Sequence, residues 1–285
     1  MKDVTNAMRA HILTAAVPYI KQYTDQYVVV KYGGNAMIDE ELKKSVMKDL
    51  MLLQLVGVKV VLVHGGGPAI NSTLDAMKIE SRFANGLRVT DEATMDVVQM
   101  VLAGKVNKGL VADLTDLGGK AVGLCGVDGN MIQVHKQNDE LGYVGSIDTI
   151  DTSIIDDVIS RGYIPVISSI GMGADGKTYN INADTVAAKI AGALKAETMV
   201  AMTNIDGVLR DVYDPTSLIS KITMAEADQL KAEGIIAGGM IPKVDCCLEA
   251  IKSGAQKVFI INGEIPHAIL IELLTDEGLG TMFVA

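Results

Sequence analysis

Short runs of apolar, often β-branched residues alternate along the chain with longer segments in which apolar residues recur every three or four positions. The short runs predict buried strands, and the longer segments predict amphipathic helices. The expected strands are residues 27–31, 58–64, 121–125, 164–170, 198–203, 257–261 and 281–284, and the expected helices are residues 40–56, 68–77, 90–106, 149–161, 184–194, 224–233, 241–253 and 266–274. Such alternation is typical of an α/β fold, a three-layer αβα sandwich in which helices cover both faces of a mostly parallel sheet.

Two segments predict hairpins. Residues 131–146 are polar with short alternating stretches, and residues 171–178 match the phosphate-loop pattern GxxxxGK followed by Ser or Thr, with GxGxxG in their first six positions. Both glycine motifs place phosphate at the start of a helix that opens from the loop, and residues 179–183 begin no helical pattern. Asp175-Gly176 is a turn signal, so we favour a hairpin and keep a phosphate loop as the alternative.

A change of pattern near residues 194–197 divides the chain into two lobes. A first lobe at 27–195 is rich in glycine loops, and a second lobe at 196–285 carries a new series of strands and helices. We expect the lobes to share one sheet, with a ligand site in the crevice where its strands end. Residues 1–26 form a separate N-terminal helix.

Composition and charge exclude several classes of function. The chain has 285 residues and a formal net charge of −10, which argues against binding to nucleic acid or to an anionic membrane. Of its three cysteines, Cys246 and Cys247 are adjacent, so a disulfide framework is excluded and a reducing, cytoplasmic setting is indicated. No apolar run approaches the ~20 residues that a membrane-spanning helix needs. We therefore expect neither a membrane anchor nor a signal peptide.

Two glycine clusters follow expected strands and precede expected helices. Lys31-Tyr-Gly-Gly-Asn35 places a lysine beside backbone N–H groups that no Cβ shields. His64-Gly-Gly-Gly-Pro68 leads into a helix, where free N–H groups and the helix dipole favour an anion. Each cluster also fits an ordinary tight turn with no ligand. His64 itself fits a histidine held by its neighbours at a strand end better than it fits a catalytic base.

Three further segments carry candidate binding groups. Arg88, in Asn85-Gly-Leu-Arg-Val-Thr90, could hold a carboxylate bidentately, although a surface ion pair is the ordinary role of such a residue. Asn180-Ile-Asn-Ala-Asp184 puts three polar side chains at a helix start, which is more than one cap requires. Gly238-Gly-Met-Ile-Pro-Lys243 puts a lysine at another helix start, against the helix dipole, and this favours a functional role.

Taken in order, and with Asn204-Ile-Asp-Gly-Val-Leu209, these motifs resemble those of the amino-acid kinase superfamily, and within it the kinases of N-acetyl-L-glutamate. The resemblance covers essentially the whole chain. It implies the amino-acid kinase fold and transfer of the γ-phosphoryl group of ATP, accompanied by Mg²⁺, to the side-chain carboxylate of N-acetyl-L-glutamate in arginine biosynthesis. A carboxylate is ionised at neutral pH and needs no general base, so such a site should be rich in cations and N–H donors.

The resemblance also implies roles for individual residues. Lys31 and Lys243 would neutralise the transferring phosphoryl group, and Asp184 would orient them. The acid would be held by Gly66, Gly67, Arg88 and Asn180. The nucleotide would be held by Gly34, Asn204, Asp206, Gly207 and Leu209. Magnesium would be bound largely by phosphate oxygens, with no protein ligand.

The segment before the first strand carries a helical apolar stripe that Pro18 should kink. Its members are Met8, Ile12, Ala16, Tyr19 and Tyr23. The sequence offers this helix no evident partner within the chain. It resembles the helix that links dimers into a hexamer in arginine-inhibited members of the family. The implied L-arginine site would use Tyr19, His267, Glu272 and Gly278, and a helix that packs locally is the alternative.

Two other functions stay open. A kinase of the same fold could act on another acid, such as a carrier-linked aminoadipate derivative. A noncatalytic amino-acid sensor could also keep the fold, but the presence of Lys31, Lys243 and Asp184 argues against it.

Overall fold

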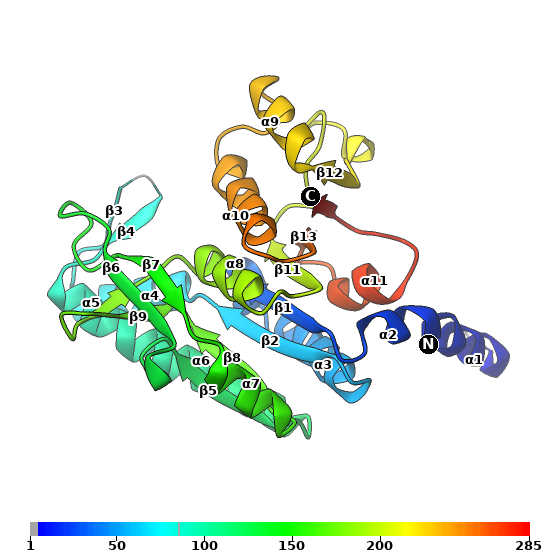
Figure 1. Ribbon diagram of the computed structural model, residues 1–285, viewed down its shortest axis with the longest axis horizontal. Helices are drawn as coiled ribbons and strands as arrows, with labels where there is room; N and C mark the ends of the chain where they lie inside the picture. Colours follow the sequence, from blue (N-terminus) through cyan, green and yellow to red (C-terminus); the bar gives the residue numbers. More distant parts are fainter. Residues whose placement is uncertain (1–4, 85) are drawn as a thin grey trace.

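The computed structural model, drawn in Figure 1, describes residues 5–84 and 86–285, apart from the side chains of residues 35 and 36. Within those residues, one eight-stranded sheet contains strands from both expected lobes, in the order β12-β14-β13-β11-β1-β2-β8-β5. Its strands are β1 (Tyr27–Tyr32), β2 (Lys59–His64), β5 (Ala121–Cys125), β8 (Ile164–Ser168), β11 (Thr198–Thr203), β12 (Lys221–Thr223), β13 (Lys257–Asn262) and β14 (Thr281–Val284). Every neighbouring pair is parallel except β13 with β14, which confirms the mostly parallel sheet.

Helices cover both faces of this sheet. The α-helices are α1 (Asn6–Ala15), α2 (Val17–Tyr23), α3 (Glu40–Leu55), α4 (Gly67–Met77), α5 (Glu92–Gln99), α6 (Asn107–Asp116), α7 (Ser153–Ser160), α8 (Ala183–Ala193), α9 (Met224–Ala232), α10 (Met240–Lys252) and α11 (Ala268–Leu274). A π-helix, η2 (Met100–Val106), joins α5 to α6, and the short 3-10 helices are η1 (Gly34–Met37), η3 (Asp128–Asn130) and η4 (Pro215–Ser217). Val29 faces a core with α8 and α10, whereas its neighbour Val28 faces a core with α3, α6 and α11. Because successive strand residues point to opposite faces, β1 serves both cores, and the three-layer sandwich is confirmed.

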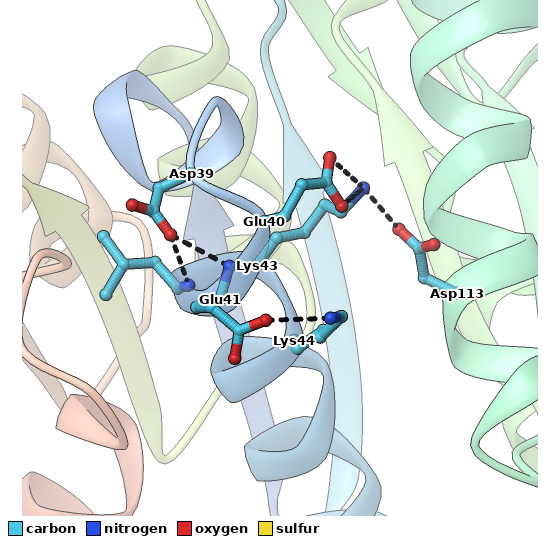
Figure 2. A network of polar contacts seen from close by, with 7 residues as sticks. Asp39, Glu40, Glu41, Lys43, Lys44 and Asp113 are labelled. Atoms are coloured by element: carbon cyan, nitrogen blue, oxygen red, sulfur yellow. Dashed lines mark hydrogen bonds and ion pairs between the residues drawn. The ribbon is translucent and has the colours of Figure 1, made fainter.

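The start of α3 shows how the local sequence fixes a helix in place (Figure 2). The Asp39 side chain accepts a hydrogen bond from the N–H of Glu41 at 2.9 Å, so Asp39 is the N-cap of this helix. One turn later, Lys43 Nζ lies 3.2 Å from Asp113 Oδ2. Since Asp113 belongs to α6, this ion pair joins two helices that cover the same face of the sheet.

A smaller sheet in the order β10-β9-β6-β7 belongs to the expected first lobe. It consists of β6 (Ile132–Lys136), β7 (Gly145–Ile150), β9 (Ile170–Gly173) and β10 (Thr178–Asn180). The pairs β6 with β7 and β9 with β10 are antiparallel, which confirms both predicted hairpins. A strand follows Gly176, which has a φ of +77°, and the phosphate-loop alternative for residues 171–178 is therefore wrong. The sequence analysis did not predict a third hairpin, β3 (Arg82–Ala84) with β4 (Leu87–Val89).

Several predicted helix bounds are wrong. The helix expected at 90–106 starts at Glu92, because Asp91 caps it and Thr90 bonds back to the carbonyl of Arg88 instead. The chain then continues through η2 into α6, a helix that the apolar spacing did not reveal. The helix expected at 149–161 begins only at Ser153, because β7 extends to Ile150.

The N-terminal segment is split between two helices, as Pro18 predicts. No described residue of α1 is buried, and its apolar side chains Met8, Ile12 and Leu13 are exposed. The second helix differs from the expectation, since Tyr23 is buried and Tyr19 and Ile20 pack against the core that contains α11. The helix without a partner in the chain is therefore α1 alone. In Figure 1, α1 projects away from the rest of the protein beyond α2 and α11.

Candidate active site

A cavity of about 300 Å³ lies where β1, β2 and β8 end. The carboxyl ends of parallel strands meet at one edge of a sheet, and ligands bind there in open α/β folds. Seven of the predicted site residues line this cavity: Lys31, Gly34, Gly66, Gly67, Arg88, Asn180 and Asp184. The sequence motifs from the N-lobe therefore converge on one place, as the sequence analysis predicts.

Lys31 and Asp184 form an ion pair in the wall of the cavity. Lys31 is the fifth residue of the central strand β1 and is only 9% exposed, and Asp184 lies in the first turn of α8. Their side chains meet at 2.9 Å between Nζ and Oδ1. The ammonium group also lies beside Gly33, where a Cβ would come within 3.3 Å of Nζ. A fixed cation next to unshielded backbone is suited to an anionic ligand.

The glycine cluster at the end of β2 supplies backbone donors. Helix α4 begins at Gly67, so the N–H groups of Gly66 and Gly67 lie at its positive end. Within the part of the chain that the structure describes, no protein group accepts a hydrogen bond from either N–H. A Cβ on Gly66 would come within 2.6 Å of Leu102 Cδ2, whereas Gly67 has open space around it. Glycine at these two positions leaves the donors accessible from the cavity.

Arg88 is a nearly buried cation on β4. It donates from Nη2 to Asn71 Oδ1 at 2.7 Å and from Nη1 to the hydroxyl of Ser81, and the ring of Phe83 lies 4.7 Å from its guanidinium carbon. Desolvation lowers the pKa of the arginine. Among the described residues no carboxylate lies within ion-pair distance of it. A cation held only by neutral groups beside a cavity is suited to a ligand carboxylate.

Asn180 and Asn182 also line the cavity. Asn180, at the end of β10, donates to the hydroxyl of Thr90 at 3.3 Å. Asn182 caps α8 by accepting from the N–H of Asp184 at 2.8 Å. Of the three polar residues of that segment, Asn182 is therefore the cap, and the other two lie at the cavity, Asn180 bonded to Thr90 and Asp184 paired with Lys31.

Lys243 does not line this cavity. It lies in the first turn of α10, a helix that packs against α8. Cys246, one turn further along, is close enough to Lys31 and Asp184 to be influenced by their charges, and burial raises its pKa to about 11. The first turns of α10 are therefore near the Lys31–Asp184 pair, although among the described residues Lys243 forms no ion pair with Asp184.

Four of the five predicted nucleotide residues lie outside this cavity, whereas Gly34 lines it. Asn204, Asp206, Gly207 and Leu209 all follow β11 in the C-lobe. Asp206 Oδ1 accepts from Asn262 Nδ2 at 2.8 Å, and Gly207 has a φ of +148°, with Thr281 Oγ1 only 2.5 Å from where a Cβ would be. Because β11 neighbours β1 in the sheet, this loop and the cavity share the carboxyl edge.

The four residues predicted to bind arginine do not all line one cavity. Tyr19 lines a cavity of about 470 Å³ between the N-terminal helices and α11, together with Asp276 and Glu277. His267 instead donates from Nδ1 to Asp49 Oδ1 at 2.6 Å, and burial raises the pKa of Asp49 to about 6. Glu272 accepts from the N–H of Leu279 at 2.7 Å, and burial raises its pKa. Gly278 lies beside that glutamate.

Three residues at the site were missed by the sequence analysis. Asn71, Ser81 and Phe83 surround the Arg88 guanidinium, as described above. Asn71 lies within a helix and Ser81 within a connection, and neither position carries a motif. The Asn-Gly pair at 85–86 could have indicated the β3–β4 hairpin that carries Phe83. Asn85 itself lies outside the described residues.

The described residues form neither a metal-binding cluster nor a membrane-spanning helix. No group of three or more His, Cys, Asp and Glu side chains is arranged to hold a metal ion. None of the helices in residues 5–84 and 86–285 is long and apolar enough to cross a bilayer.

Comparisons with known proteins agree with this geometry. The model of the amino acid kinase family matches residues 26–262. An acetylglutamate kinase of Brachyspira hyodysenteriae is 52% identical over 285 residues, 99% of each chain. One of Clostridium kluyveri is 54% identical over 275 residues, which is 96% of this chain and 97% of that protein.

Solved structures share the fold. N-acetylglutamate synthase of Neisseria gonorrhoeae, complexed with coenzyme A and N-acetyl-glutamate, has a TM-score of 0.84 at 27% identity, covering 97% of this chain and 63% of the synthase chain. Carbamate kinase of Giardia lamblia bound to AMP-PNP has a TM-score of 0.64 at 17% identity, covering 91% of this chain and 98% of that chain, a likeness of fold alone. Similarity over the whole length, in sequence and in fold, shows that this chain is a kinase of the amino acid kinase family.

Proposed function

We propose that this kinase transfers the γ-phosphoryl group of ATP to the side-chain carboxylate of N-acetyl-L-glutamate, giving an acyl phosphate for arginine biosynthesis. The observation that carries the proposal is the cavity that holds Lys31, Arg88 and the free N–H groups of Gly66 and Gly67 together. Relatives more than 50% identical to this chain are acetylglutamate kinases, which supports this choice of acid.

The chemistry of the cavity suits this reaction. A carboxylate attacking a phosphoryl group brings one anion onto another, and no proton has to be removed from it first. Fixed cations and backbone donors lower that barrier. The cavity offers these groups, and its one histidine neighbour, His64, is fully buried behind the glycine cluster. Burial lowers the pKa of His64 to about 4, so this imidazole is neutral at pH 7 and does not add to the positive charge.

We assign each side chain a role on this basis. Lys31, held by Asp184, neutralises the transferring phosphoryl group, and Lys243 joins it when the nucleotide is bound. Gly66 and Gly67 donate to the acid, Arg88 binds its α-carboxylate, and Asn180 faces its acetylated amino group. The nucleotide extends from Gly34 to the C-lobe loop formed by Asn204, Asp206, Gly207 and Leu209. Magnesium enters with ATP, bound by phosphate oxygens.

The two lobes divide these tasks. Residues 27–195 bind the acid and dimerise, and residues 196–285 bind ATP and contribute to the site for L-arginine. We place the enzyme in the cytoplasm, where ATP is available and its cysteines stay reduced.

Trapping of the product with hydroxylamine tests the proposal. ATP-dependent hydroxamate should form with N-acetyl-L-glutamate and much less with free L-glutamate or L-aspartate, because the acetyl group removes an ammonium that would lie unpaired in a partly dry cavity. Equal rates with the free amino acids would transfer the assignment to another kinase of the fold. Binding of amino acids with no turnover at all would favour a sensor.

We further propose that L-arginine inhibits the enzyme and that the chain forms a hexamer, a trimer of dimers joined by α1. An exposed apolar helix supports the assembly, since Met8, Ile12 and Leu13 are 52%, 57% and 73% exposed. The cavity beside α2 supports the ligand, because Asp276 and Glu277 in its wall can meet a guanidinium near Tyr19. His267, Glu272 and Gly278 brace the α11 segment that forms its other side.

Deleting residues 1–15 should reduce the hexamer to dimers, retain most activity and weaken inhibition by arginine. The cut removes α1 and leaves α2, whose Tyr23 is 3% exposed and belongs to the core. Sedimentation velocity and inhibition curves measure the two effects. A full-length chain with Met8, Ile12 and Leu13 changed to serine is the matched variant, because it keeps the length and loses only the apolar face. If both variants stay hexameric and fully sensitive to arginine, the proposal is wrong.

A further inference from the structure

Behind the glycine cluster lies a buried polar pair that the proposed mechanism does not use. His64, the last residue of β2, is 0% exposed, and Asn107, the first residue of α6, is 1% exposed. The imidazole Nε2 lies 3.1 Å from Asn107 Nδ2, and the imidazole Nδ1 lies 2.8 Å from the carbonyl oxygen of Gly65. Buried polar groups are costly unless they are paired, so this arrangement requires an explanation.

The neighbours of the two imidazole nitrogens determine which one carries the proton. The carbonyl oxygen of Gly65 beside Nδ1 can only accept, so Nδ1 is the donor. The Asn107 amide nitrogen lies 2.8 Å from the carbonyl oxygen of Val166 and 3.4 Å from that of Leu124, so it is a donor too, and His64 Nε2 accepts from it at 3.1 Å. A neutral imidazole that accepts at Nε2 carries its proton on Nδ1. His64 therefore donates from Nδ1 to the carbonyl of Gly65.

That donation fixes the orientation of one peptide plane in the glycine cluster. The carbonyl of Gly65 and the N–H of Gly66 belong to the same planar unit and point in opposite directions. Holding the carbonyl toward the core therefore turns the N–H of Gly66 away from it. Gly66 is buried, it lines the cavity, and no described group accepts from its N–H.

The π-helix η2 explains why Asn107 reaches this position. In an α-helix, residues five positions apart point about 140° away from each other. A π-helix bonds residue i to residue i+5, so such residues share a face. Leu102 and Asn107 are five apart across η2, and both face the glycine cluster, one against Gly66 and the other against His64. Irregular helical turns of this kind are often found at functional sites.

We propose that His64 and Asn107 are positioning residues that aim the N–H of Gly66 at the oxygens of the bound acid and the transferring phosphoryl group. The proposal rests on the function proposed above. It adds an explanation of what holds the N–H of Gly66 in a fixed orientation. Neither side chain touches the substrate. Without them the Gly65–Gly66 peptide could rotate, and the N–H of Gly66 would no longer point at the reacting groups.

Two substitutions of His64 distinguish a role in orienting the Gly66 N–H from a role in packing alone. Asparagine places its amide nitrogen close to the position of imidazole Nδ1, so His64→Asn keeps a donor for Gly65. Glutamine places its amide group at the position of Nε2, so His64→Gln keeps the contact with Asn107 and loses that donor. We expect His64→Gln to lower kcat about 30-fold with the KM for ATP unchanged, and His64→Asn to stay within about threefold of the parent. Leu114→Ala is the control, because it opens a cavity in the same helix α6 at a side chain that belongs to the other core.

The imidazole nitrogens of the unsubstituted protein provide a second readout, which needs no turnover and no folded variant. Nitrogen-15 NMR of His64 should show a protonated Nδ1 and an unprotonated Nε2 from pH 6 to pH 8. A protonated Nε2 would overturn the proposal, as would equal losses or no loss in the two His64 variants. If the protein shows the expected tautomer but does not phosphorylate N-acetyl-L-glutamate, the proposed function is wrong. The orientation of the Gly66 N–H by His64 would then still stand.

Discussion

Replacing Lys31 by alanine is expected to lower kcat about 100-fold or more. The ammonium group lies in the cavity wall at 9% exposure of the residue, and Asp184 holds it at 2.9 Å. Because it is already fixed before the reaction, it stabilises developing charge without reorganising, and such a donor is typically worth about 3 kcal/mol. The loss should appear in kcat more than in the KM of the acid, which is bound mainly by other groups. Steady-state kinetics with both substrates measures the two parameters.

Lys59→Ala is the matched control for Lys31. It removes a lysine from the neighbouring strand β2, but at the opposite edge of the sheet, where Lys59 lies over the ring of Tyr27. Its kcat should remain near that of the parent. Lys243→Ala should lower kcat by a similar factor to Lys31→Ala if α10 brings that lysine to the nucleotide. Unchanged turnover in both lysine variants, Lys31→Ala and Lys243→Ala, would remove the proposed mechanism.

Changing Arg88 to lysine is expected to raise the KM for N-acetyl-L-glutamate about tenfold or more and to change kcat less. Lysine keeps the charge but cannot reproduce the planar, bidentate grip on a carboxylate. It also cannot satisfy Asn71 and Ser81 together with a ligand, since these two side chains accept from both terminal nitrogens of the guanidinium. An arginine that is 7% exposed and held in this way is already oriented before the acid binds.

Arg82→Lys is the control for Arg88→Lys. Arg82 lies on β3 of the same hairpin and is exposed, so the same chemical change is made outside the cavity. Initial rates at varied acid and saturating ATP compare the two variants. A normal KM in Arg88→Lys would show that this side chain does not bind the substrate carboxylate.

The parts of the site that lie on strand ends are predictable from the sequence. Apolar runs locate the strands, and the topology of a parallel sheet then brings Lys31 and the glycine cluster after His64 to one edge. Asp184 is predictable as well, because a helix start with three polar residues needs only one of them as a cap. In these cases a local pattern and the global fold require the same arrangement.

The groups that orient those residues are not predictable in this way. Asn71 looks like an ordinary helical residue, and Asn107 directly follows the helix expected at 90–106. Their partners, Arg88 and His64, are distant in sequence. The π-helix is hidden too, because the apolar spacing of residues 90–106 fits a continuous α-helix. Tyr23 packs into a core formed by later elements, so its burial depends on tertiary contacts that no pattern in residues 1–26 reveals.

Transfer of labelled oxygen tests the central claim most directly. N-acetyl-L-glutamate carrying ¹⁸O in its side-chain carboxylate is incubated with the enzyme, ATP, Mg²⁺ and hydroxylamine. If that carboxylate attacks the γ-phosphorus, one of its oxygens bridges carbon and phosphorus, and hydroxylamine then releases phosphate with the bridging oxygen attached. The account predicts inorganic phosphate with one ¹⁸O atom in amounts equal to the hydroxamate. Unlabelled phosphate, which water attack on ATP would produce, would contradict it.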